Sequence, residues 1–157
     1  MSPQTGITFT PTEKHPRFQS RKFHHTHKLD QNPRCCQWKG VTCDQNGRVS
    51  GLNLSSESIT SGIDRSSALF SLRYLETLNL AYKSLNSTPI PSNVGDLTNL
   101  RDLNLSNSGF SGQIPVGLSL LSKLVTLYFP GTRSLQIENP NLSTLIGNLS
   151  GVEELHL

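Results

Sequence analysis

The segment LRYLETLNL, residues 72–80, sets a pattern that recurs three times further along the chain. The later copies are LTNLRDLNL at 97–105, LSKLVTLYF at 121–129 and LSGVEELHL at 149–157. Their second apolar positions, Leu75, Leu100, Leu124 and Val152, are 25, 24 and 28 residues apart. Four copies in one register indicate an array of similar structural units.

Within each copy, the final triplet, which is Leu-x-Leu except for Leu-x-Phe at 127–129, alternates apolar and polar residues, as a strand with one buried face does. A unit this short cannot bury its own leucines, so neighbouring units stack and share one core. A period of about 20–29 residues with this pattern is the signature of leucine-rich repeats. We therefore predict an α/β solenoid, with a parallel β-sheet on its concave face and loops, 3-10 turns and short helices on its convex side.

The charge is divided unevenly along the chain. The 157 residues carry a formal charge of +3, but residues 1–34 hold six Lys/Arg against two Asp/Glu, and residues 35–157 hold eight against nine. The repeats therefore have no strongly basic surface, which argues against a nucleic-acid partner.

Residues 1–34 are rich in Pro, Thr, His and Lys and show no apolar period. We predict a disordered basic tail there. Its histidines, His24, His25 and His27, have no placed fourth ligand, so a metal site is disfavoured. No segment of the chain has the apolar run of a signal peptide or of a membrane span.

A second distinctive segment, CCQWKGVTCD at 35–44, precedes the repeats and runs into another Leu-x-Leu triplet at 52–54. A stacked solenoid exposes its core at each end and needs a cap there. We predict that Trp38, held in this cysteine-containing loop, covers the first end.

These residues resemble plant extracellular leucine-rich-repeat receptors. The cap matches their CC-x-W-x-GVxCD motif, and the Ile-Pro pairs at 90–91 and 114–115 match their repeats. Segments 61–64, 66–72, 103–107, 112–115 and 138–143 resemble most closely the Verticillium wilt disease resistance receptor-like proteins. The resemblance covers residues 35–157 and does not extend to the tail.

By that resemblance, Cys36 pairs with Cys43 in a disulfide. Cys35 is left as a reduced thiol, because the chain lacks the upstream cysteine with which the family pairs it. The competing interpretation is a zinc site formed by Cys36, Cys43 and the tail histidines, which fits no usual ligand spacing.

The resemblance also implies a longer protein, since family members begin with a signal peptide, carry more repeats and end in a membrane anchor. We interpret the chain as a fragment of such a receptor. Residues 1–34 are a tail unrelated to the family, residues 35–56 a partial cap with the first strand, and residues 57–157 the repeats, truncated in the fourth. The resemblance places the receptor at the plasma membrane, on its extracellular side.

Three inward positions depart from the family, which has an asparagine after each Leu-x-Leu-x-x. Here these positions are Lys83, Ser108 and Thr132. We expect Ser108 and Thr132 to make part of the backbone bonds of the asparagine, and Lys83 to keep its charge near water. The third repeat has four extra residues around 137–142, which we interpret as a tolerated insertion or a ligand-shaping loop.

Acceptor sites of the form Asn-x-Ser/Thr occur at five positions, Asn53, Asn86, Asn104, Asn141 and Asn148. They predict a glycosylated, secreted surface. The repeat's own Leu-x-Leu-Ser pattern accounts for part of this count.

No catalytic pattern is found in the sequence. No serine lies in a G-x-S-x-G motif, no Gly-rich phosphate loop occurs, and His156 is expected on the outward side of the last strand with no organised partner. We predict a protein that is not an enzyme and needs no cofactor.

The function is then expected on the concave face, formed by the residues between the leucines. Those residues are Glu76, Thr77, Asn79, Ala81 and Tyr82, then Arg101, Asp102, Asn104, Ser106 and Asn107, then Val125, Thr126, Tyr128, Pro130 and Gly131. As ligand-binding residues we select Glu76, Asn79, Tyr82, Arg101, Asp102, Asn104 and Tyr128. The tyrosines are the preferred anchors, because interfaces are enriched in tyrosine and arginine.

Four hypotheses remain open. The favoured one, which the resemblance implies, is that the chain is part of a cell-surface receptor-like protein that recognises a pathogen-derived protein or peptide. Such a receptor signals through a co-receptor kinase, which is bound by regions outside this chain. The second is a secreted inhibitor that resembles polygalacturonase-inhibiting proteins. The third is a truncated remnant without activity, and the fourth a metal-binding regulator built on the tail.

Overall fold

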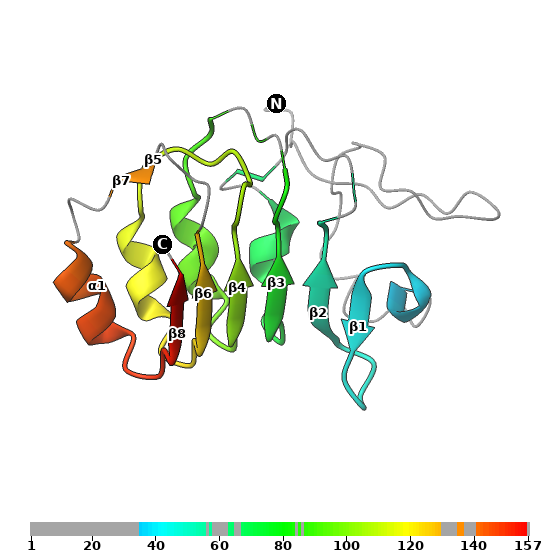
Figure 1. Ribbon diagram of the computed structural model, residues 1–157. Helices are drawn as coiled ribbons and strands as arrows, with labels where there is room; N and C mark the ends of the chain where they lie inside the picture. Colours follow the sequence, from blue (N-terminus) through cyan, green and yellow to red (C-terminus); the bar gives the residue numbers. More distant parts are fainter. Residues whose placement is uncertain are drawn as a thin grey trace, which may run out of the picture.

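The computed structural model describes residues 35–55, 57, 63–64, 67–83, 85, 87–129, 135–136 and 141–156. One sheet of six strands runs through them (Figure 1). Its strands, in spatial order, are β1 (Val41–Cys43), β2 (Val49–Asn53), β3 (Thr77–Asn79), β4 (Asp102–Asn104), β6 (Thr126–Tyr128) and β8 (Glu154–His156). β1 is antiparallel to β2, and every later pair is parallel.

The other side of the solenoid consists mainly of short helical turns (Figure 1). These are η3 (Ala68–Ser71), η4 (Ser92–Asp96), η5 (Val116–Leu120) and the α-helix α1 (Leu142–Asn148). A further short turn, η2 (Cys35–Gln37), lies beside β1 at the end of the sheet (Figure 1). A two-stranded parallel sheet of β5 (Gly112–Gln113) and β7 (Leu135–Gln136) joins two of the connecting segments. The predicted leucine-rich-repeat solenoid with its 3-10 turns is confirmed.

The repeated leucines form one continuous core between the sheet and the turns. Equivalent leucines are paired in register across the strands, in the series Leu52, Leu78, Leu103, Leu127 and Leu155. The second to fourth of these are buried, with 0–2% of their surface exposed. Truncating any of those three to alanine is expected to cost about 2–5 kcal/mol, since each fills space shared by two repeats.

Sharp turns end two of the strands. Tyr82 and Asn107 occupy equivalent positions after β3 and β4, and both have positive φ values, of 56° and 50°. The residues just before these turns, Ala81 and Ser106, are buried. The prediction that Ala81 and Ser106 line the concave face is therefore wrong, because the backbone begins to turn toward the core there.

The inward positions after the strands differ from one repeat to the next. The hydroxyl of Ser108 donates to the carbonyl oxygen of Leu105, at 2.6 Å, within a fully buried site. Lys83 is only 4% exposed and donates from Nζ to the carbonyl oxygen of Glu57. The prediction that Lys83 stays near water is wrong, since its long stem lets it reach an acceptor 26 residues earlier, in the preceding repeat.

Several predictions concern residues outside the described ranges. These are the disordered tail at 1–34 with its histidines, the inward role of Thr132, the concave positions Pro130 and Gly131, and most of the insertion around 137–142. They stay predictions, as do the boundaries of the three proposed regions.

Candidate recognition surface

The solvent-facing side of β3, β4, β6 and β8, with the residue before each strand, is called the strand face here. Its residues are Glu76, Thr77 and Asn79, then Arg101, Asp102 and Asn104, then Val125, Thr126 and Tyr128, and finally Glu153, Glu154 and His156. They are exposed or half-buried, while the leucines between them point into the core. This surface contains six of the seven predicted ligand-binding residues, all except Tyr82.

The asparagines of the strands have a structural role that the sequence pattern did not show. Oδ1 of Asn79 accepts a hydrogen bond from the backbone N–H of Ala81 at 2.9 Å, and Oδ1 of Asn104 accepts one from Ser106 at 3.0 Å. Asn53 does the same for Ser55 at 3.0 Å. Each bond satisfies a backbone donor just past a strand end. The amide oxygens of Asn79 and Asn104 are therefore oriented toward their own backbone, which leaves each amide nitrogen and a second lone pair of each oxygen for contact with a ligand.

Tyr128 is the centre of an organised cluster. Its ring stacks on the imidazole of His156, with centroids 4.3 Å apart and planes 8° from parallel. Its hydroxyl donates to Oε2 of Glu154 at 3.0 Å, and Nε2 of His156 lies 4.0 Å from the same oxygen. The prediction that His156 faces outward holds, but the expectation that it has no organised partner is wrong.

Electrostatics at Tyr128 reflect two nearby carboxylates. The hydrogen bond to Glu154 is the main reason why the pKa of Tyr128 is raised above 10.0, and the negative charge of Asp102 adds to the shift. In the sheet register, Asp102 is the partner of Thr126, two residues before Tyr128 on β6. Glu154 was not selected from the sequence. Its position directly before the Leu-x-Leu triplet at 155–157 could have identified it as a strand-face residue.

The remaining predicted residues belong to the two preceding strands and their ends. Glu76, Arg101 and Asp102 are exposed at the starts of β3 and β4. Tyr82 is 73% exposed and lies beyond the end of β3. The structure therefore brings Tyr128 and Asp102 together and leaves Tyr82 at the far edge of the strand face.

A second aromatic contact lies at the junction of the cap and the first repeat. Cζ of Arg48 lies 3.9 Å from the ring centroid of Tyr74, and its guanidinium forms an ion pair with Oδ2 of Asp44 at 2.7 Å. Hydrogen bonds from Arg48, chiefly that of its backbone N–H, lower the pKa of Asp44. Sequence spacing gave no signal for Tyr74, because only the stacked fold brings it to Arg48.

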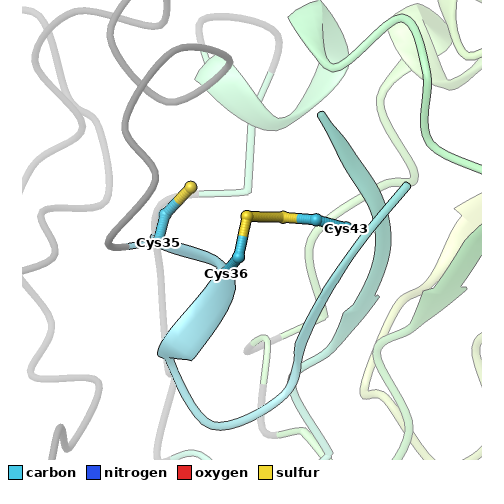
Figure 2. Close-up of side chains that lie close together, drawn as sticks. All are labelled: Cys35, Cys36 and Cys43. Atoms are coloured by element: carbon cyan, nitrogen blue, oxygen red, sulfur yellow. A yellow bond between two sulfur atoms is a disulfide. The ribbon is translucent and has the colours of Figure 1, made fainter. Parts of the chain in front are cut away.

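The cap contains a disulfide between Cys36 and Cys43, the pair that the resemblance implies, with Cα atoms 5.6 Å apart. Cys35 lies beside it on η2, is 1% exposed and keeps its thiol (Figure 2). The three sulfurs all lie within 4.8 Å of one another. Because the disulfide occupies two of them, the zinc interpretation through Cys36 and Cys43 does not describe this structure.

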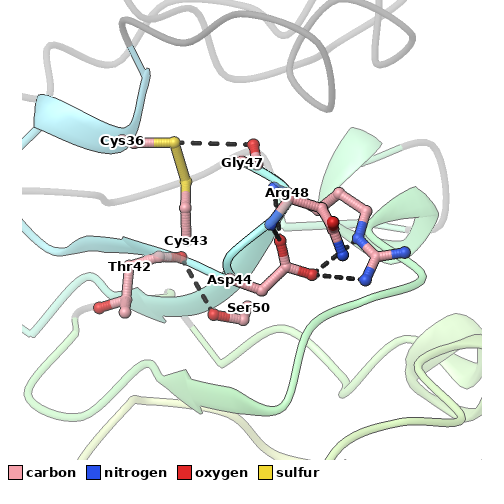
Figure 3. The surroundings of a disulfide bond; sticks show 8 residues. Cys36, Thr42, Cys43, Asp44, Gly47, Arg48 and Ser50 are labelled. Carbon is pink, nitrogen blue, oxygen red and sulfur yellow. Dashed lines mark hydrogen bonds and ion pairs between the residues drawn. A yellow bond between two sulfur atoms is a disulfide. The ribbon is translucent and has the colours of Figure 1, made fainter.

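The disulfide is anchored to the turn that leads into β2. Sγ of Cys36 lies 3.6 Å from the carbonyl oxygen of Gly47, and the carboxylate of Asp44 accepts backbone hydrogen bonds from Asn46 and Arg48 (Figure 3). Gly47 has a φ of 75°, which the turn requires. The partly buried Trp38 packs against the core, as predicted for a cap.

The predicted glycosylation sites differ in their surroundings. Asn53 and Asn104 lie at the ends of β2 and β4, and Asn148 is exposed at the end of α1. Asn141 is the N-cap of α1, and its Oδ1 accepts the N–H of Thr144 at 2.8 Å. Asn86 lies outside the described residues. Modification of these asparagines stays a prediction.

Comparison with known proteins finds relatives among plant receptor-like proteins. The chain is 38% identical over 139 residues to Receptor-like protein 6 of Arabidopsis thaliana, a match that covers 84% of this chain and 14% of that protein. It is 33% identical over 138 residues to Receptor-like protein 9DC1 of Solanum pimpinellifolium, covering 87% of this chain and 16% of the relative. No protein-family model matches the chain. The chain thus spans about a seventh of the length of these relatives.

Solved structures with the same fold come from plants as well. A plant ice-binding protein matches with a TM-score of 0.65 and 25% identity, over 84% of this chain and 44% of that one. The ectodomain of the receptor kinase GASSHO1/SCHENGEN3 from Arabidopsis thaliana, in complex with CASPARIAN STRIP INTEGRITY FACTOR 2, matches with a TM-score of 0.53 and 28% identity, over 86% and 19%.

Fold and cap together define a leucine-rich-repeat protein of the plant ectodomain type. The chain is related to a part of the plant leucine-rich-repeat receptor-like proteins, a family of the cell surface. The prediction that it is not an enzyme is confirmed by this relationship, since the match to a receptor kinase is to its ectodomain. In the part of the chain that the structure describes, no helix is long and apolar enough to cross a membrane.

Proposed function

We propose that this chain is part of a cell-surface receptor that recognises a protein or peptide ligand on its strand face. The carrying observation is the arrangement of exposed charged and aromatic side chains in register across four parallel strands, with Tyr128 held rigidly at its centre. Rigid aromatic side chains lose little conformational entropy on binding and are common anchors of interfaces. The related GASSHO1/SCHENGEN3 ectodomain, solved with a bound partner, supports this assignment.

The ligand is proposed to be pathogen-derived and the response to be disease resistance. This finer assignment rests on the resemblance of segments such as 66–72 and 138–143 to the Verticillium wilt disease resistance proteins. Signalling is then carried by a co-receptor kinase, bound through regions of the full-length receptor outside this chain. Ligand contact is assigned to Glu76, Arg101, Asp102 and Tyr128, with Tyr82 at the edge.

The decisive experiment is genetic complementation in the source plant. The gene is disrupted and restored either as wild type or as the variant Arg101→Glu/Tyr128→Ala, and colonisation by a vascular wilt fungus is measured. The variant is expected to leave the plant as susceptible as the disrupted line, because two strand-face contacts are lost. Full resistance with this variant would overturn the proposal.

A matched control changes the opposite side of the solenoid. Val116 and Leu120 of η5 are 66% and 64% exposed, so the variant Val116→Thr/Leu120→Gln alters the surface without opening the core. It is expected to restore resistance, provided that all three proteins accumulate to the same level on a blot. Loss of resistance with both variants would mean that ligand binding is not specific to the strand face.

The competing function, inhibition of polygalacturonase, has its own assay. The purified chain is mixed with a fungal endopolygalacturonase, and release of reducing sugar from pectate is measured. We expect no inhibition at micromolar concentrations. Inhibition that the variant Arg101→Glu/Tyr128→Ala abolishes would replace the receptor assignment by that of an enzyme inhibitor.

A further inference from the structure

We propose that the strand face contains a binding site for an arginine side chain of the ligand, between β4 and β8. In this site Asp102 and Glu154 pair with the guanidinium, and the ring of Tyr128 stacks against it. The inference rests on the proposed recognition function and names the chemistry of the ligand.

The register of the sheet places the three residues around one gap. Asp102, Thr126 and Glu154 are partners in one row across β4, β6 and β8, and Asn104, Tyr128 and His156 form the next row. Neighbouring strands lie about 4.8 Å apart, so the two carboxylate-bearing Cα atoms are separated by roughly 9–10 Å. Between them on β6 lies Thr126, whose side chain is short, and the hydroxyl of Tyr128 reaches Glu154 from the next row.

Tyr128 offers one ring face to such a cation. His156 stacks on the face toward β8, and the hydroxyl is fixed by its bond to Glu154. The opposite face looks toward β4, where Asn104 is turned to the backbone of Ser106. A guanidinium above a tyrosine ring is attracted by the negative charge density of the ring face.

The chain already contains one arginine bound in this way. The guanidinium of Arg48 lies 3.9 Å over the ring centroid of Tyr74 and is ion-paired with Asp44 at 2.7 Å. A tyrosine face and a carboxylate at one edge therefore suffice to hold arginine in this protein. Tyr128 and Asp102 present the same two groups to the outside.

The charge of the strand face favours a cationic partner. It carries four carboxylates, those of Glu76, Asp102, Glu153 and Glu154, against the single guanidinium of Arg101, whereas the whole chain is formally at +3. Among the described residues, neither Asp102 nor Glu76 forms an ion pair, and Arg101 forms none with them. The exposed carboxylate of Asp102 is thus available to a ligand, and two carboxylates match the planar fork of arginine better than the point charge of lysine.

The test is a titration of the full chain with acetyl-Gly-Arg-Gly-amide, followed by ¹⁵N–¹H NMR. The backbone amides of Asp102, Thr126, Tyr128 and Glu154 are expected to shift with saturation. The isosteric citrulline peptide, which is uncharged, should produce no such shifts. The double variant Asp102→Asn/Glu154→Gln should bind about tenfold more weakly, because it loses two charge-assisted hydrogen bonds.

The control is Asp96→Asn, which removes one carboxylate from η4 on the opposite side of the solenoid, where the double variant removes two from the strand face. It should bind the arginine peptide as the wild type does. Equal binding of the citrulline peptide or of the corresponding lysine peptide, acetyl-Gly-Lys-Gly-amide, would overturn the arginine site, as would an equal weakening by Asp96→Asn. The arginine peptide could fail to bind while Arg101→Glu/Tyr128→Ala still abolishes resistance in plants. In that case the receptor assignment stands and only the arginine site is refuted.

Discussion

A Cβ atom on Gly117 would lie 2.2 Å from the carbonyl oxygen of Ser92, so the two residues are packed backbone against backbone. On the facing turn, a Cβ on Gly95 would lie 2.5 Å from the carbonyl oxygen of Gly117. No real Cβ tolerates such distances. The two glycines therefore set how closely η4 and η5 approach on the helical side of the solenoid.

Gly117→Ala is expected to lower the free energy of unfolding by about 1–3 kcal/mol, because the methyl group must push η5 away from η4. Urea denaturation followed by circular dichroism measures the change. The matched control is Gly147→Ala in α1, where a Cβ would meet nothing within 4 Å. Since alanine favours helix over glycine, that variant should gain about 0.5–1 kcal/mol. Equal effects of the two substitutions would contradict the close-packing explanation.

The buried Lys83 should give the protein a distinctive dependence on pH. Burial lowers the pKa of Lys83 below its ordinary value of 10.5, and the charge of Glu57 opposes this only in part. Below its folded-state pKa, the lysine is charged in both states and its burial costs stability. As the pH rises toward 10.5, the folded state releases the proton first, so this cost diminishes.

The wild type should therefore gain stability relative to Lys83→Met as the pH is raised from 7 to 10. Urea midpoints at four pH values follow the difference between the two proteins. Lys39→Met serves as the control, because Lys39 is exposed, and its difference from the wild type should stay constant. A constant difference for Lys83→Met as well would show that the ammonium is fully hydrated.

The sheet could be predicted from sequence because its strands recur with a period that is marked mainly by leucine. Each Leu-x-Leu triplet specifies a strand whose two leucines point inward, and the register Leu78–Leu103–Leu127 follows from aligning the copies. The burial of Ala81 was not predictable in this way, since it depends on the left-handed turn at Tyr82.

The candidate site was predictable only in outline. Alternation put Tyr128 and Asp102 on the strand face, but the stack on His156 and the bond to Glu154 depend on side-chain directions across β6 and β8. The period also could not show that Asn79 and Asn104 accept hydrogen bonds from their own backbone. The sequence pattern therefore predicts which residues lie on the strand face. Which of their side chains contact one another can be seen only in the folded structure.

Tyr82 adopts a φ of 56°, a conformation that bulky residues rarely take. Asparagine, which occupies the equivalent position at Asn107, tolerates it better. Tyr82→Asn should accordingly be more stable than Tyr82→Ala by about 0.5–1 kcal/mol, since both lose the ring and only asparagine suits the turn. Thermal unfolding compares the two variants. At Tyr74, which has no positive φ, asparagine should show no advantage over alanine, and a similar gain there would refute the backbone explanation.

The three clustered cysteines should allow one disulfide to replace another. In Cys36→Ser, the sulfurs of Cys35 and Cys43 start within 4.8 Å of each other, so a small shift of η2 closes a new disulfide. Peptide mapping without reduction, after blocking of thiols, should find Cys35 linked to Cys43. The free energy of unfolding should stay close to that of the wild type, because the length of the closed loop changes by only one residue.

Removing the thiol of Cys35 provides the control for this exchange. Cys35→Ser/Cys36→Ser has no partner left for Cys43 and should lose about 2–3 kcal/mol relative to the wild type, the amount expected for opening a loop of this size. Cys35→Ser alone should keep the bond between Cys36 and Cys43 and stay close to wild-type stability, because its side chain changes by one atom. If Cys36→Ser carries two reduced thiols and is as unstable as the double variant, Cys35 cannot reach Cys43, and the disulfide of the cap has no substitute.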